Sequence, residues 1–272
     1  MNPFRSIALH TVMVVLAVAT ITPGLWMVLA SLMPAGEAST FPPTFIPSRI
    51  SFEHYATLFT RLEVGKYLLN SLILSVSITA ISLFFNSMAG YAFAKYRFAG
   101  RDRLFRLLVA EMVIPAQVTT LPLFLMLNKV GLVNTYFGVI VAGMATIYGI
   151  FLIRQFTLSL PDSLIEAARM DGASEFRIYW SVILPLCRPI LITLAVFTFL
   201  GSWNDFFWPL IVLTDDSMYT LPVALAILSG EHVQDTELMM AGAVLTILPV
   251  MIVFLATQKY YIDGIMLGGV KG

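Results

Sequence analysis

The sequence predicts an all-α fold in which six helices cross a membrane, and two observations lead to that fold class. The first is composition, because 58% of the 272 residues are hydrophobic and only 12% are charged, an excess too large for a soluble core of this length. The second is that the apolar residues gather in six long runs. Each run reaches or approaches the roughly 20 residues that a helix needs to cross a hydrocarbon layer about 30 Å thick. Lipid is therefore the expected solvent for much of the surface.

The six expected spans form a single transmembrane domain over residues 1–272. They cover residues 7–30, 68–94, 104–127, 136–158, 189–213 and 240–258. The first span follows Arg5, as the apolar region of a secretory signal would. Its apolar stretch is longer than such a region, so we expect a retained helix.

The Lys and Arg residues near the span ends orient the chain, because positively charged loops stay in the cytoplasm. With the amino terminus inside, most of these residues fall on the cytoplasmic side: Arg5, Lys95, Arg97, Arg101, Arg103, Arg106, Arg154, Arg169, Arg177, Arg188, Lys259 and Lys271. Those left outside are Arg49, Arg61, Lys66 and Lys129. Both termini are therefore expected in the cytoplasm.

Two segments between the spans have patterns of their own. The external segment 31–67 contains FPPTFIP from Phe41, whose three prolines favour an extended chain, with one short helix expected at about 52–59. The stretch 219–230 is apolar but too short to cross a membrane. We expect it to form a re-entrant or interfacial half-helix, with its backbone satisfied by protein or by a watery cavity.

Several classes of function are excluded by what the sequence lacks. The formal net charge of zero argues against a nucleic-acid partner. The single cysteine, Cys187, rules out an intramolecular disulfide, and the three histidines, His10, His54 and His232, are too scattered to suggest a metal site. The only Gly-Lys pair, Gly65–Lys66, lacks the rest of a phosphate-binding loop, and no nucleophile elbow or zinc signature is present. No catalytic residue, metal or cofactor is therefore expected in this chain.

The cytoplasmic loop 159–188 predicts two short helices. Ser159 is expected to cap the first, Pro161 fits its first turn, and Gly172 ends it in a conformation that other residues resist. Ser174 is expected to start a second, amphipathic helix that Pro185 terminates. The residues alone are equally compatible with a simple linker made of two interfacial helices.

The segment that starts at Glu166, EAARMDGASEFRIYWSVILPLCRPIL, resembles the EAA loop of importer-type ABC permeases. The family pattern is EAA, three residues, Gly and a later Ile-x-Leu-Pro; here Ile183 and Leu184 are adjacent, a slight departure. In such permeases this helix docks into a cleft of the ATP-hydrolysing subunit. The resemblance therefore implies that the docking contacts are made by Glu166, Ala167, Ala168, Asp171 and Gly172.

The resemblance extends over nearly the whole chain. The segments NSLILS, GYAFAKYRFAGR, IPAQVTTLPLFLML, GLVNTYFGVI, WNDFFWPLIVL and YYIDGIMLGGVKG look, in the same order, like maltose-type carbohydrate permeases. This likeness implies a second, similar permease subunit, two ATPase subunits that bind ATP and Mg, and an extracytoplasmic solute-binding protein. It also implies a carbohydrate as solute and a place in the cytoplasmic membrane of a bacterium or archaeon.

Polar residues inside spans are the candidates for the solute pathway, because they are costly in lipid. Trp203, Asn204 and Asp205 are expected in the outer half of the fifth span, where they offer hydrogen bonds and a flat apolar face to a sugar. Gln117 in the third span and Asn86 in the second are weaker candidates. The alternative is that these residues form an interfacial aromatic belt and hold helices together.

Two other functions remain open from the sequence. Glycerol phosphate or a polyol could replace the sugar, although the spans offer little Lys or Arg to bind a phosphate. A proton-coupled secondary transporter would need buried acids or paired broken helices, for which Asp205 alone is thin support.

Overall fold

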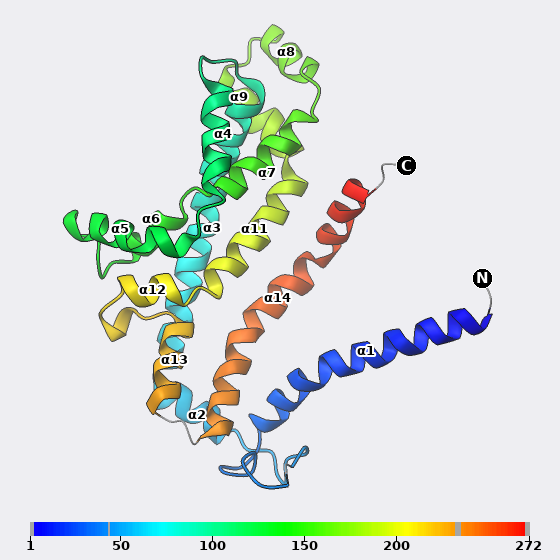
Figure 1. Cartoon of the computed structure of the whole chain (residues 1–272), viewed down its shortest axis with the longest axis vertical. Coiled ribbons are helices and arrows are strands. Elements are labelled where there is room, and N and C mark those ends of the chain that lie inside the picture. Colours follow the sequence, from blue (N-terminus) through cyan, green and yellow to red (C-terminus); the bar gives the residue numbers. More distant parts are fainter. Residues whose placement is uncertain (1–2, 43, 232–234, 270–272) are drawn as a thin grey trace. The chain divides into compact units, whose positions relative to one another are not determined.

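The computed structural model of the chain describes residues 3–42, 44–231 and 235–269, and within them every regular element is helical. Of the residues named above, His232 and Lys271 lie outside the described part. In chain order the helices are α1 (Pro3–Ala30), α2 (Glu53–Thr60), α3 (Val64–Lys95), α4 (Arg101–Glu111), α5 (Ala116–Lys129), α6 (Tyr136–Gly143), α7 (Ile147–Leu158), α8 (Ser163–Met170), α9 (Glu175–Ile178), the π-helical turn η1 (Tyr179–Ile183), α10 (Leu184–Leu186), α11 (Arg188–Trp203), α12 (Phe207–Val212), the 3-10 turn η2 (Asp216–Met218), α13 (Leu221–Glu231) and α14 (Thr236–Gly269) (Figure 1).

The chain divides into two compact units. The first comprises Met1–Lys66 and Ala224–Val250, and the second comprises Tyr67–Val223 and Met251–Gly272. Helices α3, α13 and α14 contribute residues to both units. The all-α fold class predicted from the sequence is confirmed.

Three helices of the described residues are long and apolar enough to cross a membrane on their own. They are α1, α3 and α14, which contain the expected spans 7–30, 68–94 and 240–258. Three bent pairs raise the number of spans to as many as six if each pair crosses once: α4 with α5 at 104°, α6 with α7 at 41°, and the helix Glu175–Leu186 with α11 at 78°.

The span expected at 104–127 is not one straight helix, because α4 ends at Glu111 and α5 starts at Ala116. Pro115 explains the break. It is in an extended conformation, with φ −60° and ψ 131°, and proline also disfavours a helical conformation at the residue before it, Ile114. The run of apolar side chains hides this interruption from a count of hydrophobic residues.

The span expected at 189–213 is also interrupted, because α11 ends at Trp203 and α12 starts at Phe207. Pro209 favours an interruption here, because in a continuous helix its ring would clash with the carbonyl of Asp205, four residues earlier. The span expected at 136–158 has a milder break before Thr146, whose side chain accepts a hydrogen bond from the Gly149 amide and caps α7.

In the first unit, the expected short helix is confirmed, and the described residues of FPPTFIP, 41–42 and 44–47, are not helical. Helix α2 starts one residue later than expected, at Glu53, and the described part of 34–52 forms turns and bends. A buried carboxylate holds this segment, because Glu237 of α14 is 1% exposed and its Oε1 accepts the Ala38 amide at 2.7 Å. The apolar stretch 219–230 forms α13, so a helix is confirmed there.

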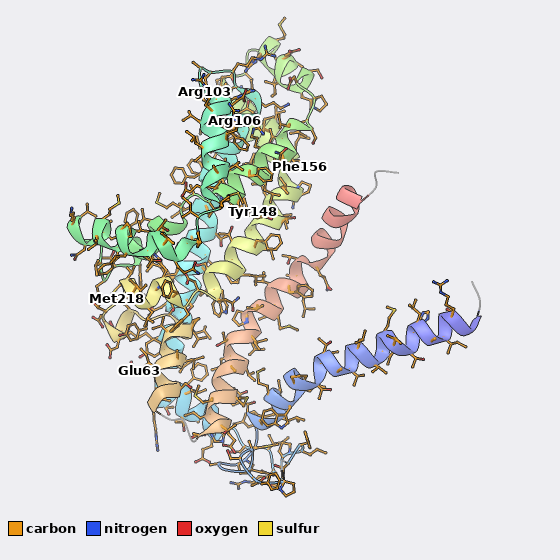
Figure 2. All side chains as sticks on the ribbon, viewed as in Figure 1. Glu63, Arg103, Arg106, Tyr148, Phe156 and Met218 are labelled. Atoms are coloured by element: carbon orange, nitrogen blue, oxygen red, sulfur yellow. The ribbon has the colours of Figure 1, made fainter. Side chains whose placement is uncertain are left out.

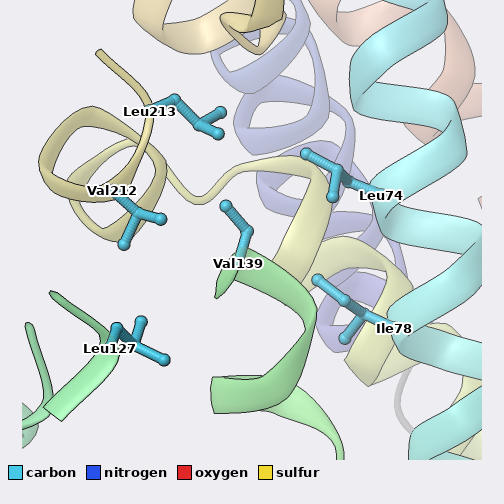
Figure 3. Packing of buried hydrophobic residues seen from close by; sticks show 6 residues of the cluster. All are labelled: Leu74, Ile78, Leu127, Val139, Val212 and Leu213. Atoms are coloured by element: carbon cyan, nitrogen blue, oxygen red, sulfur yellow. The ribbon is translucent and has the colours of Figure 1, made fainter. Parts of the chain in front are cut away.

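The core of the second unit packs four helices around one apolar cluster (Figure 3). Its buried members are Leu74 and Ile78 of α3, Leu127 of α5, Val139 of α6, Val212 of α12, and Leu213. Close packing of these side chains holds the helices together, because in lipid van der Waals contact takes the place of the hydrophobic effect. The cluster therefore fixes α5, α6 and α12 against α3, and these are helices that line the cavity described below.

Candidate functional site

The loop predicted to couple to a partner folds as two helices separated by a tight turn. Helix α8 ends at Met170, and Gly172 takes a left-handed conformation with φ +76°. Ser174 then caps α9, because its side chain accepts a hydrogen bond from the Arg177 amide. These three predictions from the local sequence are confirmed.

The start of α8 differs from the prediction. Ser159 lies at the end of α7, where its hydroxyl donates to the Phe156 carbonyl at 2.7 Å, so it does not cap α8. Asp162 occupies the capping position without a capping hydrogen bond. Its carboxylate instead pairs with the Lys95 ammonium at 2.5 Å, and this hydrogen bond holds the pKa of Asp162 below its usual value.

The second helix also differs from the prediction, because Pro185 does not end it. The turn η1 has π geometry, in which the Leu184 amide donates to the Tyr179 carbonyl five residues earlier. Helix α10 continues to Leu186, and the chain bends only at Cys187 before α11. Pro185 lies at the start of α10, directly after the π turn.

Helix α8 has a buried face and an exposed face. Ile165 is 4% exposed and belongs to a second cluster, with Tyr91, Ile178, Tyr179, Ile183 and Cys187. Of the predicted docking residues, Ala168 is partly buried against this cluster, whereas Glu166, Ala167, Asp171 and Gly172 are exposed. Met170 is 89% exposed beside them. The helix thus presents small and polar side chains, and one flexible apolar one, to its surroundings.

The end of α3 is tied to both helices of this loop. Lys95 donates to the Leu160 carbonyl at 2.6 Å in addition to pairing with Asp162. Tyr96 donates from its hydroxyl to Glu175 Oε2 at 2.7 Å. Burial, together with the Glu175 carboxylate, raises the pKa of Tyr96, so its hydroxyl keeps the proton that it donates.

Arg169 closes the same structure across the Gly172 turn. Its Nε and Nη2 donate to the two carboxylate oxygens of Glu175 at 2.7 and 3.2 Å, a forked geometry that fixes the angle between α8 and α9. Sequence reasoning missed Lys95, Tyr96 and Glu175, because the first two lie more than 60 residues from their partners and no local pattern marks the pairing.

A cavity of about 610 Å³ lies in the second unit among α3, α5, α6, α7, α11 and α12. Its polar lining residues are Gln117, Thr119, Thr120, Thr146, Tyr148, Thr198, Ser202 and Asp205, and its aromatic walls come from Tyr148, Phe197, Phe207 and Trp208. Figure 2 labels Tyr148, on α7. Among the described residues that line the cavity, Asp205 carries the only charge.

Two predicted pathway residues, Gln117 and Asp205, meet in this lining although 88 residues separate them in the chain. Asp205 lies in the break between α11 and α12, and its Oδ1 accepts the Trp208 amide at 3.3 Å. The carboxylate of Asp205 therefore faces the cavity from the break between the two helices. Tyr148, Thr198 and Ser202 were missed, because single hydroxyl residues in an apolar helix give no distinctive signal.

The structure places the other three predicted pathway residues elsewhere. Trp203 is 1% exposed and stacks on Phe199, with ring centroids 5.9 Å apart, so its ring is not available to a solute in this conformation. Asn204 is exposed and donates back to the Leu200 carbonyl at 2.8 Å.

Asn86 is fully buried and joins α3 to the start of α7. Its amide nitrogen donates to Ser82 Oγ at 2.9 Å and to Thr146 Oγ1 at 3.2 Å, while its oxygen accepts the Thr146 amide at 2.9 Å. A Cβ at Gly149 would lie 2.2 Å from the Asn86 side-chain nitrogen, so glycine permits the close approach. Asn86 therefore acts in helix packing.

The described residues contain no group of three or more side chains suited to hold a metal ion. The cavity lining offers hydrogen-bonding and aromatic side chains.

Comparison with known proteins places this geometry in context. Residues 86–265 match the model of a family described as "binding-protein-dependent transport system inner membrane component". Among curated relatives, the arabinooligosaccharides transport system permease protein AraQ of Halalkalibacterium halodurans is 40% identical over 262 residues, covering 94% of this chain and 93% of the relative. The diacetylchitobiose uptake system permease protein NgcG of Streptomyces coelicolor is 33% identical over 254 residues, covering 92% and 84%.

A solved structure has the same fold. It is that of a bacterial ABC transporter involved in the import of the acidic polysaccharide alginate, with a TM-score of 0.86 and 25% identity. The match covers 96% of this chain and 97% of the solved chain.

Proposed function

Because this chain belongs to the family of binding-protein-dependent transport system inner membrane components, we propose that it is the permease subunit of an ATP-driven importer that moves a carbohydrate into the cytoplasm. The observation that carries the proposal is the combination of an exposed α8 with a hydroxyl-rich cavity in the same unit. The first offers a contact for an ATPase subunit, and the second offers a route for the solute.

The cavity lining favours a carbohydrate over a phosphorylated solute. Thr, Ser, Tyr and Gln side chains can bond sugar hydroxyls, and Phe197, Phe207 and Trp208 offer flat apolar faces to C–H surfaces. A glycerol phosphate would need Lys or Arg, and none of the described lining residues is basic. Two relatives named for arabinooligosaccharides and diacetylchitobiose also support an oligosaccharide.

The complex we propose contains a second, homologous permease, two ATPase subunits and an extracytoplasmic solute-binding protein. The ATPase subunits bind ATP and Mg, and this chain supplies no catalytic group. When the ATPase subunits close, a docked α8 moves with them, and the bonds of Lys95 and Tyr96 pass this displacement to α3. Helix packing in the membrane then shifts between inward-open and outward-open arrangements.

Transport by the reconstituted complex tests this proposal. We expect proteoliposomes containing all partner subunits to accumulate an oligosaccharide only with ATP and the solute-binding protein. Glu166→Lys, which reverses a charge on the exposed face of α8, should weaken ATPase binding and lower uptake, whereas the exposed Glu53→Lys in α2 should not. Uptake driven by a proton gradient without ATP would support the secondary-transporter alternative instead.

The orientation we propose has both termini in the cytoplasm, with α8 inside and the η2 segment outside. With Cys187 replaced, a cysteine at Ser217 should react with an impermeant thiol reagent from outside intact cells. A cysteine at Ser174 should react only after the membrane is opened. The reverse labelling pattern would overturn the orientation.

A further inference from the structure

A basic surface on the second unit is used neither by the cavity nor by the bonds that hold α8 and α9. It is a depression of about 510 Å³ formed by the α3–α4 connection and the first two turns of α4, lined by Arg97, Phe98, Gly100, Arg101, Asp102, Arg103 and Arg106. We call it the α4 basic surface. Figure 2 shows Arg103 and Arg106 on α4, within this surface.

The charges of this surface are poorly balanced. Its single acid, Asp102, pairs with Arg101, with Nε and Oδ1 2.9 Å apart. Within the described part of the chain, Arg97, Arg103 and Arg106 have no carboxylate at ion-pair distance. Three guanidinium groups therefore remain to attract an anion from outside the chain.

Several contacts organise the arginines. Arg101 Nη1 donates to the Tyr96 carbonyl at 3.2 Å, and Arg106 Nε donates to the Asp102 carbonyl at 3.2 Å. Gly100 starts α4 from a left-handed conformation, with φ +83°, so the chain turns sharply just before the helix. The guanidinium groups consequently meet at one depression.

Exposed apolar side chains accompany this charge. Phe98, Leu104 and Leu107 are 43%, 50% and 69% exposed, and all three lie in the α3–α4 connection or on α4. A free phosphate in water would not need them. A phospholipid presents a phosphate and an acyl chain side by side, and basic clusters directly next to a span recognise anionic headgroups.

We propose that the α4 basic surface binds the headgroup phosphate of an anionic phospholipid, with Phe98, Leu104 and Leu107 against its acyl chains. This inference requires only that the chain lies in a membrane, so it is independent of the solute. Arg103 and Arg106 are the groups to test, because Arg97 also lines a separate depression beside α8.

Lipid retention by the purified complex, measured by native mass spectrometry against added phosphatidylglycerol or phosphatidylcholine, tests the site. We expect the double variant R103Q/R106Q to weaken phosphatidylglycerol binding about 25-fold, at about fivefold for each arginine removed. Phosphatidylcholine binding should stay unchanged. The matched control R49Q/R61Q removes two exposed arginines elsewhere in the chain and should bind phosphatidylglycerol as the parent does.

A charge-preserving variant and a change of ionic strength test the role of charge further. R103K/R106K keeps both charges and should retain most of the binding, which separates a loss of charge from a loss of fold. Raising the ionic strength should weaken binding in the parent, because exposed charges are screened.

Four outcomes would overturn the proposal. The first is unchanged phosphatidylglycerol binding in R103Q/R106Q, and the second is equal retention of the two lipids by the parent. The third is full displacement by millimolar inorganic phosphate, which would indicate a site for the free anion. Loss of the ATPase subunits from R103Q/R106Q with lipid binding intact would likewise reassign the surface to a protein contact.

Discussion

The hydroxyl of Tyr96 donates a 2.7 Å hydrogen bond to Glu175 Oε2, and it thereby joins the end of the long helix α3 to the start of α9. Glu175 is held at the same time by the forked contact from Arg169 of α8. Three helices thus meet at one carboxylate, and a displacement of α8 reaches α3 through two bonds.

Removing the Tyr96 hydroxyl should loosen this connection without disturbing the core. Tyr96→Phe loses one hydrogen bond to a charged group at the surface, worth about 1 kcal/mol. We expect ATP hydrolysis by the complex to continue while solute uptake per ATP falls. Tyr136→Phe, at another half-buried tyrosine, is the control and should leave the ratio unchanged. An unaltered ratio in Tyr96→Phe would show that this bond transmits nothing.

The ion pair between Asp162 and Lys95 should give α8 a pH-dependent stability. The pKa of Asp162 is lowered by Lys95, so the stabilisation is full above the unfolded value of about 3.8 and is lost as the pH falls through the lower folded value. Hydrogen exchange of the α8 amides, corrected for intrinsic rates, should therefore show wild-type protection above that of Asp162→Asn from pH 7 down to about 4. Below that range the two should converge; a constant difference at acid pH would contradict the assignment.

The effect of a substitution at Gly172 should depend on how well the new residue tolerates the left-handed backbone conformation, and not on the size of its side chain. Apart from the neighbours of Gly172 in the chain, no atom of the described residues lies within 4 Å of a Cβ placed there, so the obstacle within this part of the chain is the φ of +76°. Gly172→Ala and Gly172→Arg should each cost about 1 kcal/mol or more and uncouple ATP hydrolysis from uptake, whereas Gly172→Asn should be nearly neutral, because asparagine tolerates this region. Equal defects in all three variants would point to a direct contact between the glycine and its partner.

Trp203 should behave as a core residue. Trp203→Ala removes a ring that is 1% exposed and is expected to destabilise the fold by about 3–5 kcal/mol, lowering the yield of assembled complex. Trp203→Phe should retain more of the packing against Phe199. A normal yield of Trp203→Ala with altered solute preference would instead return this residue to the pathway.

Asp205 offers the complementary test in the cavity. Asp205→Asn keeps an oxygen that can accept the Trp208 amide but removes the only charge among the described lining residues. We expect normal assembly with a changed uptake rate or solute preference. Asp205→Ala removes both the charge and the acceptor of the Trp208 amide. A defect in Asp205→Ala without one in Asp205→Asn would mean that only the hydrogen bond matters.

Local chemistry explains what the sequence could predict. Gly172 and Ser174 were identified because a left-handed stop and a helix cap each depend on a few neighbouring residues. The long uninterrupted apolar runs predicted α1, α3 and α14 for the same reason. Near Pro115 and Pro209, hydropathy could not place the break, and a proline alone did not mark it, because Pro23, Pro122 and Pro249 lie inside continuous helices.

Contacts between distant segments explain what the sequence could not predict. Trp203 and Asp205 are two residues apart, yet one is buried in the core and the other lines the cavity, because α11 ends between them. Lys95 and Tyr96 adjoin arginines in the sequence and resemble an ordinary positively charged loop. Their bonds to Asp162 and Glu175 become visible only when the helices are packed.

The π turn at 179–183 fixes the number of residues that the segment after Ser174 can contain. Each residue of an α-helix advances the chain by about 100°, so the extra residue in η1 decides whether Ile178 and Ile183 face the same cluster. A one-residue deletion there would rewind the turn to α geometry and rotate everything before it by about a quarter of a circle. This loop segment would thus be as intolerant of insertions and deletions as the interior of a span.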